Sequence, residues 1–457
     1  MNDIYIESLH VKNVRLFTEL NIQFNRKFNF LAGPNGCGKT SVLACISHCF
    51  HQIGLEYSRY GKDAEFWADL TMNENKYRVG LGKDSVNENE YRKAPIKQWI
   101  APPQGGERML IGYKNGKPQE YKVQLSMESK MIEWIKQGVL DDYKEGMAIS
   151  IPIFQVNEKL KFTPLFIGAR RNISYQQIQG VQREKPFEEA LQEYSQNNMR
   201  SLYGEWQTNI KQWIVNRYFM IDKDWAEHEK QNWLHFTKYL PRIAPFNSNF
   251  SYVKTGRDFE PIFSIYGKEC YLEEISAGYQ AVLSLIIDIF AWVEGTKEGD
   301  DRIVTNANGI VLIDEPDIHL HPEWQLTLRE GLSALFPNLQ FIVTTHSPHL
   351  LASADAGEVI IMPKSYTDDV YNLVPREKSF SGWDTDDILR EIMGVESLDN
   401  TVRAKLIRDA LHAVNTKNKD ELKNIIGKLK DICHPNDTIV TELTLELASL
   451  QAGNVER

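Results

Sequence analysis

The sequence predicts an α/β protein in which a mixed or parallel sheet is flanked by helices and interrupted by β-rich and helical inserts. Two observations predict this class. Short apolar strands alternate with helical segments near the N-terminus and again between residues 250 and 365, which is typical of parallel βα units. The 457 residues are 42% hydrophobic and 25% charged, which provides enough apolar mass for a sizeable core.

Composition also narrows the environment of the protein. The formal charge of −10 argues against a surface coated by nucleic acid, although it allows a local basic patch. No apolar run approaches the ~20 residues of a membrane span, and the N-terminus lacks the apolar region of a signal peptide. Five cysteines over this length do not make a disulfide framework. We therefore expect a cytoplasmic protein with no membrane partner.

The first 56 residues begin the α/β part. Segments 4–14 and 20–25 alternate polar and apolar side chains and carry β-branched residues, so both are predicted strands. Segment 28–33 is a short apolar strand, and segment 41–50 is a predicted helix. A glycine-rich loop separates these last two.

Two inserts follow, and then the α/β pattern returns. Residues 57–150 are predicted to be β-rich, and residues 151–249 are predicted to be helical and aromatic-rich. Residues 250–365 complete the α/β part, and residues 366–457 are predicted to be a helical C-terminal region. Within 250–365 the predicted elements are a strand pair around Ser251 and Ile262, helices at 280–292 and 322–336, and strands at 309–314, 340–346 and 359–363.

The glycine-rich loop carries a phosphate-binding motif. Residues 33–40, GPNGCGKT, match the pattern G-x-x-x-x-G-K-[ST] in full, between an apolar strand and a helix. Glycines allow successive backbone N–H groups to surround phosphate oxygens, and the helix N-terminus adds its positive dipole end. Lys39 is expected to reach the β- and γ-phosphates, and the Thr40 hydroxyl to coordinate Mg²⁺. The motif predicts a nucleotide site.

An acidic pair after a second apolar strand supplies the other half of this site. The strand 310–313 ends in Asp314-Glu315-Pro316. Asp314 is placed to bind Mg²⁺, and Glu315 to polarise the attacking water as a general base. Paired with the phosphate loop, this arrangement predicts hydrolysis of the nucleotide.

Two further segments accompany these motifs. Ile275-Ser276-Ala277-Gly278 precedes a long apolar helix, so Ser276 and the Gly278 amide are placed either as a helix cap or as an anion-binding helix start. The strand 341–345 ends in His346, which is either structural or able to sense the γ-phosphate.

The order of the four segments (GPNGCGKT, ISAGYQ, VLIDEPDIHLHP and TTHSPHL) resembles the ABC-type branch of P-loop ATPases that contains the SMC, RecF and OLD-type proteins. The resemblance implies an ABC-type ATPase head with β-rich and helical inserts. It also implies that ATP is sandwiched between two head-to-tail subunits, with the Ser-x-Gly signature of one subunit contacting the γ-phosphate held by the other.

The resemblance assigns roles by position. Residues of the phosphate loop and its helix start bind the nucleotide, Ser276 and Gly278 form the signature, Asp314 and Thr40 hold the metal, and Glu315, His346 and Lys39 carry the chemistry. Arg15 is a candidate nucleotide contact, and Gln155 a guess for the glutamine loop. The nucleotide-binding residues expected from the loop are Gly33, Asn35, Gly36, Cys37, Gly38, Lys39, Thr40 and Ser41.

The rest of the chain separates members of this branch. The stretch between Lys39 and Ser276 is broken by Pro and Gly and has no sustained heptads, so no long coiled-coil arm is expected. The segment after residue 363 is predicted to be helical, so no nuclease domain of the TOPRIM type is expected. The chain most resembles the Septu-type ATPase of bacterial anti-phage systems, which implies a separate HNH nuclease partner.

Partners beyond a second copy stay open at this level. Residues 91–138 contain nine Lys or Arg and four Glu, which is either a solvated β-insert or a surface facing DNA or a partner. Two alternative functions also remain: a RecF-like DNA-repair ATPase, and an ATPase sensor that restrains a toxin or TOPRIM effector. Arg170-Arg171 follow the predicted strand 164–169 and are expected either to engage phosphate or a carboxylate, or to form a plain salt bridge.

Overall fold

A five-stranded parallel sheet forms the centre of the larger of two compact units, which comprise residues 1–394 and 395–457. Its strand order is β15-β3-β14-β13-β9, and all four pairings are parallel. Every residue of β3, β13 and β14 is buried. The carboxyl ends of the strands therefore meet at one edge of the sheet. The strands are β3 (Phe28–Ala32), β9 (Leu165–Ile167), β13 (Gly309–Ile313), β14 (Leu339–Thr345) and β15 (Val359–Ile361).

This computed structural model describes most of the chain. The described residues are 3–50, 60–73, 75–83, 96–101, 107–114, 117–124, 161–171, 173–244, 248–367, 369–395, 401–435 and 437–452. Gln155 and much of the basic stretch 91–138 lie outside these ranges, so the predictions made for them stay predictions.

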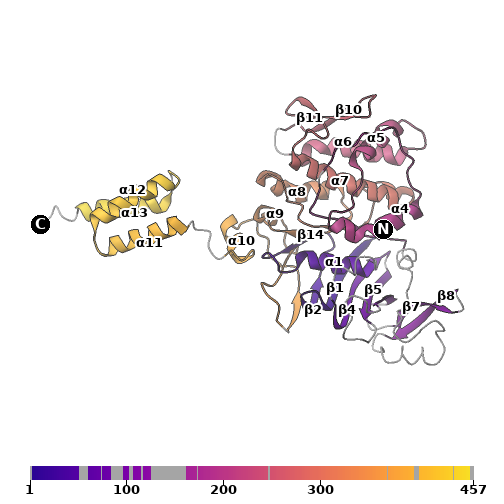
Figure 1. Cartoon of the computed structure of the whole chain (residues 1–457), viewed down its shortest axis with the longest axis horizontal. Helices are drawn as coiled ribbons and strands as arrows, with labels where there is room; N and C mark the ends of the chain where they lie inside the picture. The colour runs from indigo at the N-terminus through magenta and orange to yellow at the C-terminus, as the bar shows by residue number, and fades with distance from the viewer. Residues whose placement is uncertain are drawn as a thin grey trace. The chain divides into compact units, whose positions relative to one another are not determined.

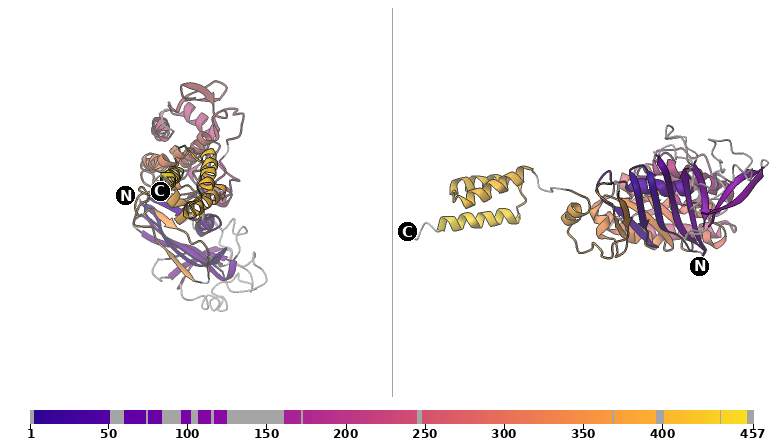
Figure 2. Two further views of the ribbon diagram at one scale, coloured as in Figure 1. Left: turned by 90° about the vertical axis from the view of Figure 1, so that its left-hand side faces the viewer. Right: turned by 90° about the horizontal axis from the view of Figure 1, so that it is seen from below.

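A second, largely antiparallel sheet of eight strands lies beside the first, and Figure 2 shows its strands side by side in the view from below. Buried Gln340 of β14 joins the two sheets, because its side-chain amide exchanges hydrogen bonds of 2.7 and 2.8 Å with the backbone of Ile6. The strand order is β16 (Val370–Leu373), β2 (Phe17–Gln23), β1 (Ile4–Val14), β4 (Tyr60–Met72), β5 (Asn75–Lys83), β6 (Ile96–Ala101), β7 (Glu107–Lys114) and β8 (Lys117–Gln124).

Helix α1 (Lys39–Phe50) lies against both sheets, with contacts to β4, β5 and β14 (Figure 1). Eleven of its 12 residues are buried, including Cys45, His48 and Cys49. A helix buried all round needs apolar or small side chains on every face, which the sequence SVLACISHCF supplies.

Helices cover the other side of the parallel sheet (Figure 1). The central one, α7, runs from Ala277 to Thr296 and is long and apolar enough to cross a membrane, a property that the sequence analysis did not find. Because 83% of its most apolar window is buried inside the fold, it serves as a core helix. The others are α4 (Phe187–Leu202), α5 (Ile210–Met220), α6 (Glu227–Ile243) and α8 (Pro322–Leu335), with the short antiparallel strands β10 (Ser251–Thr255), β11 (Pro261–Ile265) and β12 (Lys268–Tyr271).

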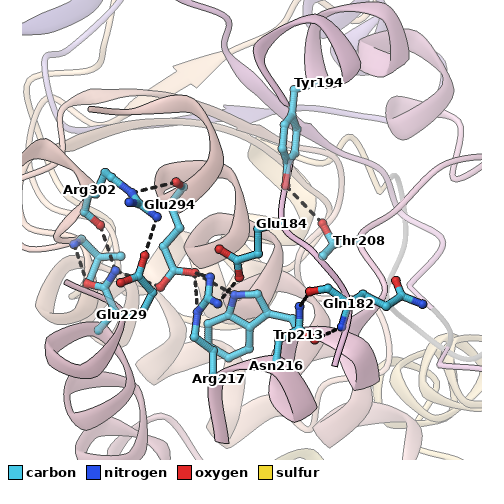
Figure 3. A network of polar contacts seen from close by, with 12 residues as sticks. Gln182, Glu184, Tyr194, Thr208, Trp213, Asn216, Arg217, Glu229, Glu294 and Arg302 are labelled. Carbon is cyan, nitrogen blue, oxygen red and sulfur yellow. Dashed lines mark hydrogen bonds and ion pairs between the residues drawn. The ribbon is translucent and has the colours of Figure 1, made fainter. Parts of the chain in front are cut away.

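A buried polar network ties α5, α6 and α7 together (Figure 3). Glu294 of α7 accepts hydrogen bonds from Arg217 Nε and Trp213 Nε1, both at 2.9 Å, and from Asn232 Nδ2 at 3.0 Å. Arg217 also donates to Glu184. Buried charges need such partners, because an unpaired one is strongly destabilising.

The unit that begins at Val395 contains three helices in its described part. Helices α11 (Thr401–Asn415), α12 (Lys419–Ile432) and α13 (Thr438–Ala452) bury a common apolar cluster that includes Leu422, Leu429 and Leu443. The first unit ends with the short helices α9 (Pro348–Ala352) and α10 (Thr385–Glu391).

The predicted α/β class is confirmed, and most elements begin within a few residues of their predicted positions. Within residues 151–249, which were predicted to be helical, Gly204 takes a φ of +69°, and residues 203–209 form a non-helical connection between α4 and α5. The short strand β12 was not predicted, and β16 lies in the region 366–457 that was predicted to be helical; helices α10, α11, α12 and α13 lie in the same region.

Candidate nucleotide site

The phosphate loop joins β3 to α1 at the carboxyl edge of the parallel sheet. Gly36 and Gly38 have φ values of +78° and +93°, which favour glycine. A Cβ on Gly38 would lie 2.9 Å from the ring of Phe17, so a side chain is excluded there. The Tyr366 hydroxyl donates to the backbone carbonyl of Cys37 at 2.9 Å and fixes the loop from outside.

Lys39 crosses its own loop. Its ammonium donates to the carbonyl oxygens of Gly33 and Pro34, both at 2.9 Å, and the side chain is buried. Burial lowers the pKa of Lys39, while Cys37, Glu315 and Asp314 act in the opposite direction. The loop therefore carries a cation where its backbone N–H groups gather.

Thr40 and Asp314 meet across the end of β14. The Thr40 hydroxyl donates to Asp314 Oδ1 at 2.9 Å, and the Thr344 hydroxyl donates to the same oxygen at 2.6 Å. Burial raises the pKa of Asp314, and these two hydrogen bonds oppose the shift. Hydroxyl and carboxylate oxygens at the mouth of a phosphate loop are the ligands that Mg²⁺ prefers, so this donor set fits the ion.

Glu315 adopts an unusual backbone conformation beside Asp314. Its φ is +48°, a left-handed value that costs on the order of 1–3 kcal/mol for a residue other than glycine. Its N–H donates to the Thr344 hydroxyl at 3.0 Å, and its carbonyl accepts from Arg171. Hydrogen bonds on both sides of the residue therefore hold this conformation.

His346 faces the Glu315 side chain. The distance from His346 Nε2 to Glu315 Oε1 is 3.6 Å, longer than a hydrogen bond. Burial, followed by the charge of Lys39, lowers the pKa of His346 below its ordinary value of 6.5, so the imidazole is mostly neutral at pH 7. The neutral imidazole of His346 and the carboxylate of Glu315 are therefore close enough for one water molecule to contact both.

Five of the predicted site residues thus converge at one edge of the sheet: Lys39, Thr40, Asp314, Glu315 and His346. A cavity of about 410 Å³ opens beside Asp314. It is lined by Ala169, Arg170, Leu202, Tyr203, Glu205 and Asp314. Arg15, the candidate nucleotide contact, donates to Ser41 Oγ at 3.3 Å and to the Tyr203 hydroxyl at 2.6 Å.

The two signature residues lie elsewhere, at the start of α7. Ser276 occupies the N-cap position and is exposed, and its hydroxyl makes no capping hydrogen bond to the described residues around it. Gly278 packs against the loop after β13, since a Cβ there would lie 2.9 Å from the carbonyl oxygen of His319. No hydrogen bond within the described ranges joins Ser276 to the phosphate loop.

Sequence reasoning missed Thr344 and left Arg171 undecided. Thr344 binds both Asp314 and the backbone of Glu315, so it organises the acidic pair. The available signal was the polar pair Thr344-Thr345 at the end of a buried apolar strand, where a hydroxyl must find a partner.

Fold and site together define an ABC-type P-loop ATPase head. The phosphate loop, the acidic strand end and the histidine strand end lie side by side on β3, β13 and β14, and an antiparallel sheet packs against the parallel one. The chain belongs to the AAA_15 family of AAA ATPase domains, which it matches over residues 113–351. It is an ATPase and a nucleotide-binding protein.

Several known proteins are similar to this chain to different extents. The chain is 23% identical to the Septu protein PtuA of Bacillus thuringiensis over 99% of both chains. It is 34% identical to the retron Vc95 probable ATPase of Vibrio cholerae serotype O1 biovar El Tor, over 26% of this chain and 24% of the relative. The SMC head domain from Thermotoga maritima aligns with a TM-score of 0.40 and 15% identity over 81% of this chain and 99% of that one. The predicted resemblance to a Septu-type ATPase is thus confirmed along the chain.

Proposed function

We propose that this chain binds Mg-ATP at the loop of residues 33–40 and hydrolyses it between two copies arranged head to tail, as a dimer or a larger assembly. The observation that carries the proposal is the convergence of Thr40, Asp314 and Thr344 within 2.9 Å contacts, with Glu315 and His346 beside them. An anion site, an oxygen donor set and a carboxylate that pairs with no Lys or Arg among the described residues are the parts that phosphoanhydride hydrolysis needs.

Each residue has a separate task in this proposal. The loop from Gly33 to Ser41, with the glycine N–H groups and Lys39, binds the phosphates. Thr40 and Asp314 hold Mg²⁺, which when bound neutralises charge on the β- and γ-phosphates. Glu315 accepts a proton from the attacking water, and neutral His346 donates a hydrogen bond to the γ-phosphate.

The second copy is proposed to supply Ser276 and Gly278. The exposed Ser276 hydroxyl and the first N–H groups of the 20-residue helix α7 form an anion-binding helix start. A γ-phosphate held by one copy is the ligand that this helix start fits on another copy.

The biological role we propose is anti-phage defence in the cytoplasm, with a separate HNH-type nuclease as the regulated partner and DNA as a further contact. The support is the likeness to the Septu protein PtuA over the full chain, together with the shorter match to a retron ATPase. Co-purification of the chain with the products of its neighbouring genes tests the partner.

Glu315→Gln tests the site and the assembly together. The amide cannot take the proton, so we expect kcat for ATP to fall by about 10²–10³-fold while Mg-ATP binding persists. The bound state should then accumulate as a dimer or larger species, measured by size-exclusion chromatography with light scattering. Lys39→Ala should abolish nucleotide binding and leave the chain unassembled.

Matched serine variants locate the contact between copies. In the Glu315→Gln background, Ser276→Arg should prevent ATP-dependent assembly, whereas Ser381→Arg, at another exposed serine, should leave it intact. An unchanged mass distribution for Glu315→Gln with Mg-ATP contradicts the sandwich, and wild-type turnover by this variant contradicts the role of Glu315.

A further inference from the structure

Arg171 lies beneath the candidate site, at the carboxyl end of strand β9. β9 pairs in parallel with β13, with Ile167 opposite Ile313, and the Asp314 N–H donates to the Ile167 carbonyl at 2.8 Å. The residues that follow β9 are thereby brought beside the acidic pair. A Cβ on Gly168 would lie 2.4 Å from the carbonyl oxygen of Ser201, so the chain passes close to the end of α4.

The Arg171 side chain contacts the backbone of Glu315 directly. Arg171 is 4% exposed, and its Nη2 donates to the Glu315 carbonyl oxygen. On the other side of the same residue, the Glu315 N–H donates to Thr344. These two contacts restrain both peptide groups of a residue whose φ of +48° is otherwise unfavourable.

Among the described residues, the rest of the Arg171 guanidinium forms no ion pair. Arg171 Nε and Nη1 are buried without a hydrogen-bond partner among the described residues. Arg171 and Asp288 of α7 both line a cavity of about 10 Å³, enough space for one water molecule. Burial lowers the pKa of Arg171 to about 10 despite the nearby Asp317, Asp314, Asp288 and Glu315.

Burying Arg171 with so few partners is energetically unfavourable, and a purely structural role does not account for it. A buried guanidinium with unmet N–H groups is less favourable than an apolar side chain of similar volume. Within the described residues, the one direct hydrogen bond of Arg171 ends on the residue proposed as the general base. The contact with Glu315 therefore accounts for this side chain better than a contribution to core stability does.

We propose that Arg171 is a positioning residue for ATP hydrolysis, which holds the peptide of Glu315 so that its carboxylate faces the attacking water and His346. This inference rests on the proposed role of Glu315. It assigns no contact between Arg171 and the nucleotide, so loss of Arg171 should slow turnover without weakening ATP binding.

The test compares Arg171→Met, Arg171→Lys, Glu315→Gln and the double variant Arg171→Met/Glu315→Gln in the full-length chain. Turnover at saturating Mg-ATP gives kcat, titration with a fluorescent ATP analogue gives Kd, and a thermal melt reports folding. We expect Arg171→Met to lower kcat about 10–100-fold with Kd within about threefold of wild type. Arg171→Lys, which keeps one donor, should recover part of the lost kcat.

The double variant separates positioning from an independent effect. If Arg171 acts through Glu315, the double variant should turn over within about twofold of Glu315→Gln alone. Arg329→Met is the control, because Arg329 binds Glu358 beside the amino ends of β3 and β15, at the opposite edge of the same sheet. Its kcat should stay within about twofold of wild type.

The outcomes distinguish the two proposals. Wild-type kcat in Arg171→Met, with Glu315→Gln inactive, overturns the inference and leaves the proposed function standing. A further proportional loss in the double variant, or a weaker Kd in Arg171→Met, also overturns it. Wild-type kcat in Glu315→Gln refutes the proposed function itself. If Arg171→Met does not fold, Arg171→Lys decides alone: lower kcat at unchanged Kd supports positioning, and unchanged kcat refutes it.

Discussion

Two arginines are buried to nearly the same degree in this protein, Arg217 at 2% exposure and Arg171 at 4%, but their surroundings differ. Arg217 donates to Glu294 and Glu184, and Glu294 is itself bound by Trp213 and Asn232 (Figure 3). Arg171 donates to one backbone carbonyl, and two of its nitrogens have no partner within the described part of the chain.

The pKa shifts of the two groups follow this difference. Burial alone lowers the pKa of both guanidinium groups, but Glu294 and Glu184 raise that of Arg217 above its ordinary value. The four carboxyl groups near Arg171 do not compensate, and its pKa falls to about 10. A satisfied buried charge indicates a structural role, and an unsatisfied one beside a reactive residue indicates a functional role.

The largest expected effect is a loss of stability on replacing Arg217, the arginine to which we assign a structural role. Arg217→Met leaves Glu294 buried without its cation, so we expect a loss of about 3–5 kcal/mol in the free energy of unfolding. Arg171→Met removes a poorly paired charge and should change it by less than about 1.5 kcal/mol. Urea unfolding of both variants measures the difference.

A surface pair provides the reference for these two variants. Lys185 pairs with Glu193 at 2.5 Å, but the Lys185 side chain is 53% exposed. Lys185→Met should therefore cost no more than about 1 kcal/mol. Equal losses in Arg217→Met and Arg171→Met would remove the distinction between the two buried arginines.

The next prediction concerns Asp288, which lines the cavity beside Arg171 and should make the stability of the protein depend on pH. Burial raises the pKa of this carboxyl to about 6 from 3.8, although hydrogen bonds from Thr208 and the charge of Arg171 act against the shift. Between about pH 4 and pH 6 the folded chain binds more protons than the unfolded chain, so Asp288 makes stability fall as the pH rises through this window.

Asp288→Asn should therefore be more stable than wild type at pH 7, by up to about 3 kcal/mol, with the gain disappearing near pH 4. The Asn side chain keeps an oxygen for the Thr208 N–H, which donates to Asp288 Oδ1 at 3.1 Å. Unfolding curves at pH 4, 5, 6 and 7 measure the gap, with the exposed Asp224→Asn as control. A gain independent of pH would exclude the titration of Asp288 as its cause.

The sequence was sufficient for the parts of the site that are contiguous in the chain. The loop of residues 33–40 and the pair Asp314-Glu315 each follow an apolar strand, and local pattern is enough to place them at strand ends. Thr344 and Arg171 were not assigned because their roles depend on register: β14 lies between β3 and β13, and β9 lies beside β13. A single sequence does not contain this pairing in local form.

The secondary-structure elements also differ in how well the sequence predicts them. The C-terminal region 366–457 was predicted to be helical, and helices α11 and α12, whose apolar periodicity is carried by local sequence, lie there. The strands β12 and β16 have four residues each and are stabilised by edge pairing with β11 and β2. None of their residues is buried, so they lack the continuous apolar run by which the three-residue strands β9 and β15 were recognised.

The smallest expected effect concerns Tyr194, which lies close to the surroundings of Arg171 but has no assigned role in catalysis. Tyr194 of α4 lies beside Thr208, with their hydroxyl oxygens 3.4 Å apart (Figure 3). The backbone N–H of Thr208 donates to Asp288. Because this hydroxyl contact is long, Tyr194→Phe should lower the free energy of unfolding by only about 0.5–1 kcal/mol. Its kcat for ATP should be unchanged, since the phenol hydroxyl has no contact with Arg171 in the described structure. Tyr194→Leu, which also removes the edge contact with Trp206 at 5.2 Å between ring centroids, should lose more. A fall in kcat for Tyr194→Phe at unchanged stability would mean that Asp288, Thr208 and Tyr194 also help to position Glu315. The residues that support catalysis would then extend from Arg171 into the helical layer.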